Sequence, residues 1–356
     1  ARMSHDGKQL SYLAPVDGVL NIWVGPIDDP AAAKAVTHEK KRPIRSYFWA
    51  YTNEHLLYVQ DAEGNEDFNV YRVDLKSGET KNLTDMKGVR AEINEVSHKF
   101  PTEIIVGLND RDPQFHDLYR LNILTGEKKL IQKNPEFAGF ITDEDYNVRF
   151  ASKMTDDGGS LILKPDGKDG WTDFLKIAME DTMTTSPAGF DKSGKIMYLI
   201  DSRGRNTGAL ETLNLDTNEE KLIAEDPRCD VGGIMAHPTE NTIQAVSFTY
   251  DRTIWKFFDK DVEADFAELK KVADGEISVA SRTLDDAKWI VAFLMDNGPV
   301  RYYVYDRASK KSTFLFTNRP NLEGLPLQKM HARVIDSRDG MKLVSYLTLP
   351  PGTDPD

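Results

Sequence analysis

The chain has a single cysteine and no long apolar segment. Cys229 is the one cysteine among 356 residues, so no disulfide can form within the chain. The longest wholly apolar run covers residues 289–295, whereas a helix that spans a bilayer needs about 20 such residues. We therefore expect a soluble protein without a membrane partner, and one cysteine is compatible with a cytoplasmic, a periplasmic or a secreted location.

Positive charge is also scarce. The chain holds 45 Lys and Arg against 58 Asp and Glu, which gives a net charge of -13. No run of Lys and Arg is longer than residues 40–42. Because a nucleic-acid backbone would be repelled on average, the sequence predicts no nucleic-acid partner.

Several motifs that would carry catalysis or ligand binding are missing from the sequence. It contains no G-x-S-x-G, no H-E-x-x-H and no Gly-Lys-Ser/Thr loop. Ser160 and Ser193 lie beside glycines, but we expect both in hairpin turns with no helix behind them. Residues 61–65 resemble the start of a calcium loop, yet Glu66 and Arg72 stand where that loop needs Gly and Glu. The sequence therefore predicts no catalytic residue, metal or cofactor.

What the sequence does contain is a repeat of short, β-prone apolar segments. Each begins with an apolar residue after a polar turn, and successive starts lie 44 to 48 residues apart. A repeat of about 40 to 50 residues with several short strands is typical of a β-propeller, with one four-stranded sheet per blade. The sequence predicts an all-β, seven-bladed propeller in which these residues begin the second strand of each blade: Leu10, Leu56, Ile104, Val148, Ile196, Ile243 and Trp289.

The repeat also predicts details of individual blades. The turn before the fourth strand is expected to open with an acidic or amide residue, namely Asp74, Asn122, Asp216 and Asp306. A helix over residues 262–272 is expected to cover blade 6, because its apolar residues have helical spacing. In blade 1 the first strand would need residues before Ala1, so we expect blade 1 to lack that strand and the chain to be trimmed at its N-terminus.

Three histidines, His5, His98 and His237, precede second strands by five or six residues, in the turn between the first and second strands of blades 1, 3 and 6. Because equivalent turns of different blades lie apart around a rim, we do not expect these histidines to converge on one metal ion. We expect them to cap turns.

The composition changes after the seventh blade. Residues 318–320 and Pro326 indicate a linker, and residues 343–349 alternate like a strand that Pro350 and Pro351 end. No blade remains to receive this strand. We therefore expect the propeller to occupy residues 1–320, with residues 321–356 forming a linker and the first segment of a second domain whose remainder is absent.

This tail carries a resemblance to a known family. Residues 337–352, Ser-Arg-Asp-Gly-Met-Lys-Leu-Val-Ser-Tyr-Leu-Thr-Leu-Pro-Pro-Gly, resemble the passage from propeller to α/β-hydrolase domain in the prolyl oligopeptidase family of serine peptidases, in its acylaminoacyl-peptidase-like branch. The family usually has Pro where His5 stands. Further matches extend the resemblance over essentially the whole chain, at residues 4–8, 21–24, 64–67, 109–113 and 303–307.

The resemblance implies a two-domain serine hydrolase that acts on short peptides or small esters. This chain would hold the non-catalytic propeller, which would act as a lid and as a sieve for substrate size. Its partner would be its own C-terminal α/β-hydrolase domain, with Ser, Asp and His in that order. The alternative is a free-standing TolB-like propeller that binds partner proteins, although such a scaffold has no use for the strand at residues 343–349.

Candidate site residues lie in the loops between the second and third strands of the blades. In an up-and-down blade these loops lie on the same edge as the connections from one blade to the next. Both ends of the propeller also lie on this edge. We therefore expect the missing domain over this edge. Arginines there suit a domain interface or a substrate carboxylate. The acids resemble those that hold a substrate amine in some relatives, although exposed turn acids are usually only solvated. The candidates are Glu66, Asp67, Arg111, Arg203, Arg205 and Arg252.

Overall fold

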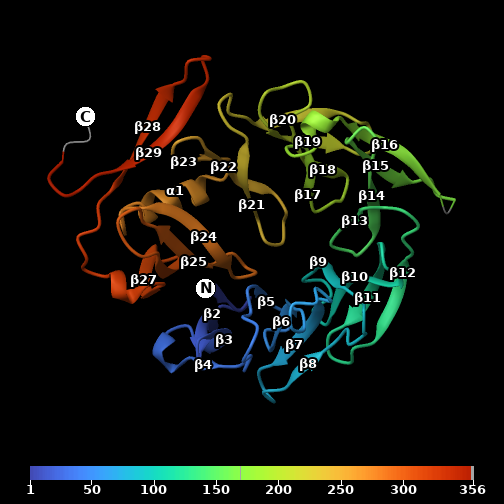
Figure 1. Ribbon diagram of the computed structural model, residues 1–356, viewed down its shortest axis with the longest axis horizontal. Helices are drawn as coiled ribbons and strands as arrows, with labels where there is room; N and C mark the ends of the chain where they lie inside the picture. Colours follow the sequence, from blue (N-terminus) through green and yellow to red (C-terminus); the bar gives the residue numbers. More distant parts are fainter. Residues whose placement is uncertain (169, 354–356) are drawn as a thin grey trace. The chain divides into compact units, whose positions relative to one another are not determined.

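The computed structural model describes residues 1–168 and 170–353, and almost all of its regular structure is antiparallel β-sheet (Figure 1). The chain divides into two compact units, unit 1 at Ala1–Met183 and unit 2 at Thr184–Asp356. Four successive sheets lie in unit 1 and three in unit 2, and these are the seven blades of a β-propeller.

Unit 1 holds blades 1 to 4, each a four-stranded sheet in which strands pair in chain order. Blade 1 consists of β1 (Arg2–Met3), β2 (Gln9–Val16), β3 (Val19–Pro26) and β4 (Lys34–Ala35). Blade 2 consists of β5 (Tyr47–Trp49), β6 (His55–Gln60), β7 (Asn69–Asp74) and β8 (Thr80–Asn82). Blade 3 consists of β9 (Ala91–Val96), β10 (Glu103–Asp112), β11 (Phe115–Asn122) and β12 (Lys128–Gln132). Blade 4 consists of β13 (Gly139–Thr142), β14 (Val148–Met154), β15 (Ser160–Pro165) and β16 (Trp171–Ile177).

Unit 2 holds blades 5 to 7 and a separate hairpin. Blade 5 consists of β17 (Ser186–Phe190), β18 (Ile196–Asp201), β19 (Ala209–Asn214) and β20 (Glu220–Ala224). Blade 6 consists of β21 (Val231–Ala236), β22 (Ile243–Thr249) and β23 (Thr253–Phe257), followed by helix α1 (Lys260–Leu269). Blade 7 consists of β24 (Glu276–Arg282), β25 (Lys288–Leu294), β26 (Arg301–Asp306) and β27 (Lys311–Thr317). The hairpin pairs β28 (Met330–Asp336) with β29 (Lys342–Thr348). Short 3-10 turns lie at η1 (Pro30–Ala32), η2 (Met179–Asp181) and η3 (Pro320–Leu322).

The predicted blade register is confirmed. In every blade the expected residue is the first or second residue of the second strand, for example Leu10 in β2 and Trp289 in β25. Both side chains are fully buried. The agreement has a simple cause, because an apolar residue that follows a polar turn and then alternates must enter a half-buried strand.

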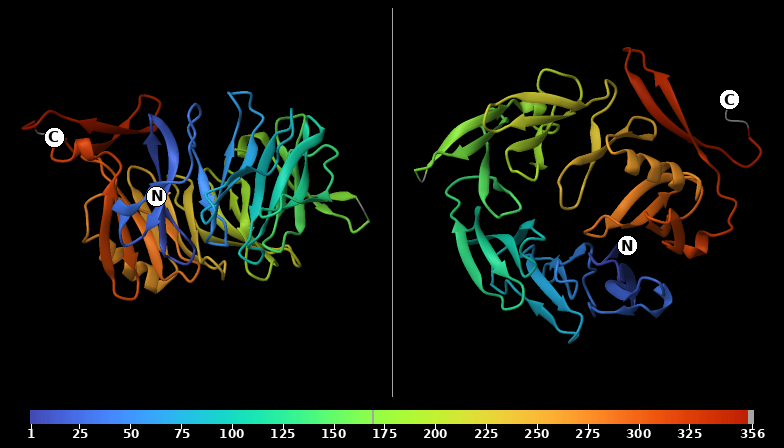
Figure 2. Two further views of the ribbon diagram at one scale, coloured as in Figure 1. Left: turned by 90° about the horizontal axis from the view of Figure 1, so that it is seen from below. Right: turned by 180° about the vertical axis from the view of Figure 1, so that it is seen from behind.

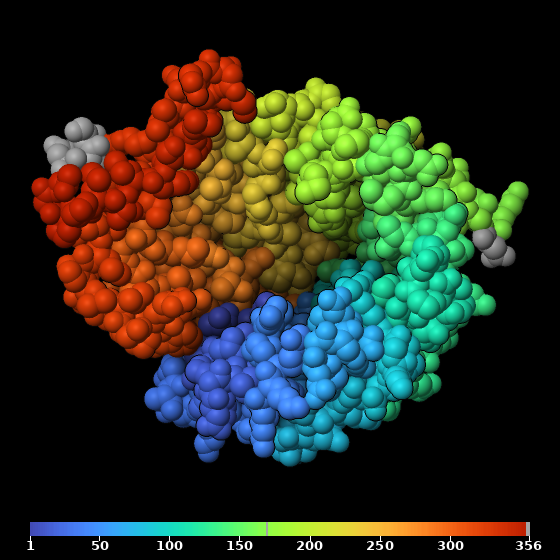
Figure 3. Space-filling view, viewed as in Figure 1, coloured from blue at the N-terminus to red at the C-terminus, as the bar shows by residue number. Residues whose placement is uncertain are grey.

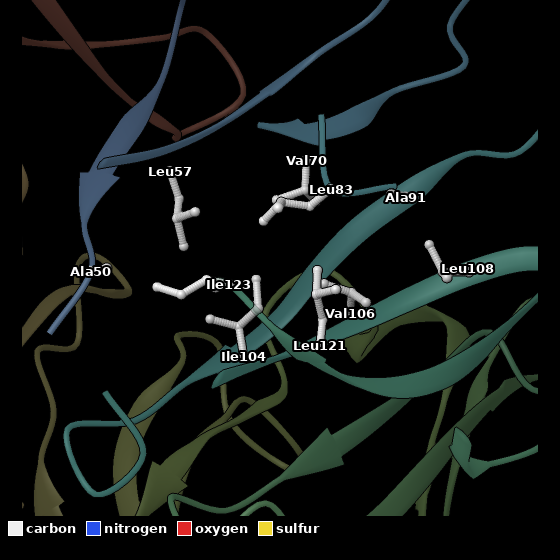
Figure 4. Close-up of a cluster of buried hydrophobic side chains, with 10 residues drawn as sticks. All are labelled: Ala50, Leu57, Val70, Leu83, Ala91, Ile104, Val106, Leu108, Leu121 and Ile123. Atoms are coloured by element: carbon white, nitrogen blue, oxygen red, sulfur yellow. The ribbon is translucent and has the colours of Figure 1, made fainter. Parts of the chain in front are cut away.

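Neighbouring blades pack through the apolar faces of their sheets. Between blades 2 and 3, Leu57 and Val70 lie opposite Ile104, Val106 and Leu121 in one buried cluster (Figure 4). Each fully buried side chain of this size contributes about 1.5–3 kcal/mol to folding. Side chains that lie far apart in the sequence therefore hold blade 2 to blade 3.

Blade 6 departs from the expected four strands. Its sheet has three strands, and α1 follows where a fourth strand was expected. The carboxylate of Asp259 caps α1 by accepting the backbone N–H groups of Asp261 and Val262, so the helix begins two residues earlier than predicted. Val262 and Phe266 are buried in the core that blades 6 and 7 share. No helix within the described residues is long and apolar enough to cross a membrane.

Two further expectations need correction. The first strand of blade 1 is present, because Arg2–Met3 forms β1 and Met3 pairs with Leu10 of β2. In blade 5 the residue that opens the turn is Asn214, because its side-chain oxygen accepts the backbone N–H groups of Asp216 and Thr217. Asp216 lies inside the turn, so the sequence assignment was two residues late.

The strand expected at residues 343–349 is present as β29, but it does not lack a partner. β28 pairs with it from Met330 opposite Thr348 to Asp336 opposite Lys342. This hairpin lies apart from the sheet of blade 7 within unit 2 (Figure 2), where Figure 3 shows it as a red ridge. Several of its apolar side chains are exposed, including Ile335 and Leu343. The assignment of residues 321–356 to a second domain stays a prediction.

Candidate functional site

Glu66 and Asp67 lie in the loop between β6 and β7 of blade 2, as predicted. The loop is built on Asp61, a buried carboxylate that accepts a hydrogen bond of 2.7 Å from Nη2 of Arg42. Asp61 also accepts the backbone N–H of Glu66, whose φ of 62° lies in the left-handed region. The side chain of Glu66 is exposed, and Asp67 shares reciprocal hydrogen bonds with Asn65. The apparent calcium loop is thus a turn ordered by an arginine.

A groove opens between blades 2 and 3 of unit 1 where this loop ends. Its volume is about 550 Å³, and its walls include Tyr47, Phe48, Tyr58, Phe68 and Ile93. Phe68 directly follows Asp67, so the predicted acids lead into the wall of the groove. Aromatic walls of this kind suit an apolar or aromatic group of a ligand.

Two opposite charges stand at the rim of the groove. Nη2 of Arg90 lies 3.0 Å from a carboxylate oxygen of Glu92, and both side chains are about half exposed. The Arg90 guanidinium also lies 5.5 Å from the centre of the Phe68 ring. His116 of blade 3 lies 4.0 Å from Glu92. This rim was not predicted from the sequence, because the candidate residues came from loops between second and third strands and Arg90 precedes a first strand.

Arg111 was expected in the loop between the second and third strands of blade 3, but it lies inside β10, next to the end of that strand, and it binds a carboxylate of its own blade. It donates through Nε and Nη2 to both oxygens of Asp117, at 2.8 and 2.9 Å, and also to the carbonyl of Asn134. Asp117 is only 1% exposed. Burial alone would raise the pKa of Asp117, but the hydrogen bonds from Arg111 and from the Asn134 N–H hold it below its usual value. The pair therefore anchors the loop from inside the blade.

The two arginines of blade 5 also pair with carboxylates of their own blade. Arg203 donates to both oxygens of Asp201 at 2.9 and 2.6 Å and to Glu220 at 2.9 Å. Arg205 donates to the buried Glu211 at 2.6 Å. Burying an acid in a strand is costly unless a cation pairs with it, so these arginines stabilise the blade edge.

Arg252 of blade 6 holds the hairpin β28–β29. Its Nη2 donates to the carbonyl of Met330 at 2.6 Å, while Asp296 of blade 7 accepts the Met330 N–H at 3.1 Å. The hydroxyl of Tyr346 donates to the carbonyl of Asp251 at 2.8 Å. Both backbone polar groups at the start of β28 are thus bound by side chains of the propeller blades. Arg252 thus binds a segment of its own chain, and its role at an interface with a second domain stays a prediction.

The serines and histidines take structural positions. Ser193 lies in a turn and donates to Asp191 at 2.7 Å, whereas Ser160 begins β15 and not a turn, contrary to expectation. His237 caps its turn by accepting backbone N–H groups, as predicted. The rings of His5 and His98, however, both contact Tyr51. Equivalent turns of blades 1 and 3 therefore come closer together than we expected.

The described residues contain no group of three or more His, Cys, Asp or Glu that could hold a metal ion. The arrangement offers an apolar groove, exposed acids beside it and paired arginines. Such a surface can bind or orient a peptide-like group.

Curated relatives match the chain over nearly its full length. It is 46% identical over 354 residues to dipeptidyl aminopeptidase BIII of Pseudoxanthomonas mexicana. The alignment covers 99% of this chain and 51% of that protein. It is 28% identical over 366 residues to dipeptidyl peptidase family member 6 of Caenorhabditis elegans. This second alignment covers 98% of this chain and 49% of that protein. The chain thus spans about half the length of the curated relatives it matches. No family model matches the sequence.

Solved structures agree on the fold at low sequence identity. A chain from a study of two prolyl endopeptidases matches with a TM-score of 0.66 and 10% identity, covering 99% of this chain and 54% of its own length. Prolyl oligopeptidase B from Galerina marginata matches with a TM-score of 0.64 and 11% identity, with coverages of 99% and 55%. A puromycin-hydrolyzing peptidase of Mycobacterium tuberculosis matches with a TM-score of 0.61 and 12% identity, with coverages of 98% and 58%.

Proposed function

This chain belongs to the prolyl oligopeptidase family as its N-terminal β-propeller, and from that premise we propose that it is the non-catalytic half of a two-domain serine peptidase. One observation carries the proposal: 99% of the chain aligns at 46% identity with a dipeptidyl aminopeptidase of which it covers only 51%. The catalytic Ser, Asp and His would lie in the other half, an α/β-hydrolase domain.

The proposed role of the propeller is to cover the catalytic site and limit the size of substrates. A ring of blades over a hydrolase site admits short, flexible chains, excludes folded proteins and reduces the access of water. We propose short peptides as the substrate class, because both named relatives are peptidases. The same names favour this role over a free-standing scaffold and give no support to small esters.

The groove between blades 2 and 3 and the loop that carries Glu66 and Asp67 would contact the peptide. The apolar walls of the groove support this assignment, since they can take up a side chain. Arg111, Arg203 and Arg205 would contribute indirectly, by holding their loops in shape through pairs with acids of their own blades. Arg252 would contribute by fixing the hairpin that leads toward the other half.

The test compares two proteins, this 356-residue chain and the full-length protein that its gene encodes. Both are exposed to a fluorophosphonate probe and to a dipeptidyl chromogenic substrate. We expect stoichiometric labelling and turnover with the full-length protein and neither with the chain alone. Labelling of the chain alone, or a full-length protein without a reactive serine, would contradict the proposal.

A further inference from the structure

A line of titratable side chains runs along the turns between first and second strands in unit 1. His5 of blade 1 stacks on Tyr51 of blade 2, with ring centres 4.1 Å apart and planes at 21°. The edge of His98 of blade 3 meets the same ring at 6.1 Å. Nδ1 of His98 lies 4.0 Å from a carboxylate oxygen of Glu144 in blade 4. Four consecutive blades are therefore joined by groups that can change their charge.

Glu95 lies within this line, at the seam between blades 3 and 4. We define the seam by its hydrogen bonds on either side of Glu95: Asn94 donates to the carbonyl of Phe140 at 3.2 Å, and the N–H of Ser97 donates to the hydroxyl of Tyr146 at 3.0 Å. Glu95 itself is half-buried and accepts the N–H of Val96 at 3.1 Å. Its position in the strand places its carboxyl between two packed blades.

The charged groups that face Glu95 are mostly acidic. The turn between β13 and β14 brings Asp143, Glu144 and Asp145. The ammonium of Lys99 lies 3.0 Å from Asp145 and 3.9 Å from Glu144, and Nη1 of Arg149 lies 3.0 Å from Asp143. The line described above adds His5, with Asp6 beside it, and His98, while Tyr51 and Tyr146 contribute phenols that the charge of Glu95 also affects.

These surroundings change the protonation of Glu95. Burial raises the pKa of Glu95 to about 7, and the charges of Glu144 and Asp143 act in the same direction. Hydrogen bonds from the Val96 N–H and from Thr142 oppose the rise without cancelling it. For His5, burial lowers the pKa below its usual value, and His98 adds to this effect.

We propose that Glu95 is a proton-operated switch in the seam between blades 3 and 4. With its proton, the carboxyl is neutral and packs within the seam. Without its proton, it faces Glu144 and Asp143 as a like charge, and the seam loosens. This goes beyond the proposed role as a lid, because it makes the stability of unit 1 respond to pH near neutrality.

The direction of the response follows from proton binding in the folded and unfolded states. Between about pH 4.5 and 7 the folded protein holds a proton on Glu95 that the unfolded chain has released, so stability from this group is lost as pH rises through about 7. His5 acts in the opposite direction, because stability from its neutral form is present above pH 6.5 and is lost on acidification. For the seam between blades 3 and 4, Glu95 therefore predicts a stability that falls as the pH rises toward neutrality.

The test follows the thermal unfolding midpoint of the 356-residue chain from pH 5 to 8.5. Glu95→Gln keeps the shape of the protonated side chain and cannot ionise, so we expect its midpoint to exceed that of the wild type by about 2–4 °C or more at pH 8.5 and to match it near pH 5. Glu127→Gln is the control from the same blade, because the side chain of Glu127 is exposed, and its difference from the wild type should not vary with pH. If the unfolding midpoints of Glu95→Gln and of the wild type change in parallel with pH, the proposed switch is wrong.

A second measurement keeps the test decisive if Glu95→Gln folds poorly. In the wild-type chain with carboxyl-labelled glutamate, one carbon-13 resonance should titrate near pH 7, and Glu95→Asp should remove it. Glu144→Gln should lower the midpoint of that resonance, because it removes a neighbouring negative charge. A Glu95 resonance that titrates near 4.5, its ordinary value, would refute the proposal.

Discussion

At the scale of single residues, this molecule repeatedly pairs a buried acid with an arginine from the same blade edge. Asp61 pairs with Arg42 in blade 2, and Asp117 pairs with Arg111 in blade 3. In both pairs the acid is almost fully buried and the arginine is partly exposed. Removing the arginine would leave an uncompensated charge inside the blade, which costs more than an exposed pair is worth.

We predict that Arg111→Ala lowers the free energy of unfolding by about 1–3 kcal/mol. Arg90→Ala, the control, removes an exposed pair with Glu92 and should cost about 1 kcal/mol or less. Because the pKa of Asp117 is lowered in the folded state, its contribution should be present above pH 3.8 and be lost on further acidification. Urea unfolding at pH 7 and pH 3 measures both effects. If Arg111→Ala and Arg90→Ala lower the free energy of unfolding equally at pH 7, the buried pair of Arg111 with Asp117 is not worth more than an exposed pair.

At the scale of elements, α1 stands where blade 6 lacks a fourth strand, and a buried carboxylate fixes it to blade 7. Asp265 is fully buried, and it accepts hydrogen bonds from the Tyr305 hydroxyl at 2.8 Å and from Nε of Arg307 at 2.7 Å. Lys310 binds the same carboxylate. The apolar face of the helix and this charged contact together cover the shared core of blades 6 and 7.

We predict that Asp265→Ala destabilises unit 2 by about 1–3 kcal/mol, because it leaves the buried Tyr305 hydroxyl without this acceptor and leaves Arg307 with Asp286 as its remaining carboxylate partner. The control Glu263→Gln changes an exposed carboxylate in the first turn of the same helix and should cost less than about 1 kcal/mol, through its interaction with the helix dipole. Hydrogen exchange of the α1 amides, read peptide by peptide, separates local loosening from global unfolding. Unchanged protection of α1 in Asp265→Ala would refute the anchoring role.

At the scale of the whole molecule, this chain spans about half the length of its curated relatives. The sieve role makes a prediction about substrate size. A peptide that the full-length protein cleaves should lose at least about tenfold in kcat/KM when a folded domain is fused close to its cleavable end, since the propeller would block entry. The matched control carries the same fused domain on a long flexible linker. Equal kcat/KM for the free and closely fused peptides would exclude the sieve.

The sequence by itself determined the blade repeat and the start of every second strand, from Leu10 to Trp289. It also placed Glu66 and Asp67 in a loop between strands and located a helix near Val262. These features could be predicted because each depends on residues close together in the chain. Alternation, turn residues and helical spacing all act over fewer than about ten positions.

Only the tertiary structure decided which residues meet across blades and loops. The contact of Arg252 with Met330 and the contact of His5 with Tyr51 have no local signal in the sequence. The same holds for the acids that surround Glu95. These contacts join positions separated by many residues, and a periodic pattern specifies that blades stack but not which side chains touch. Packing and the need to pair each buried charge decide that.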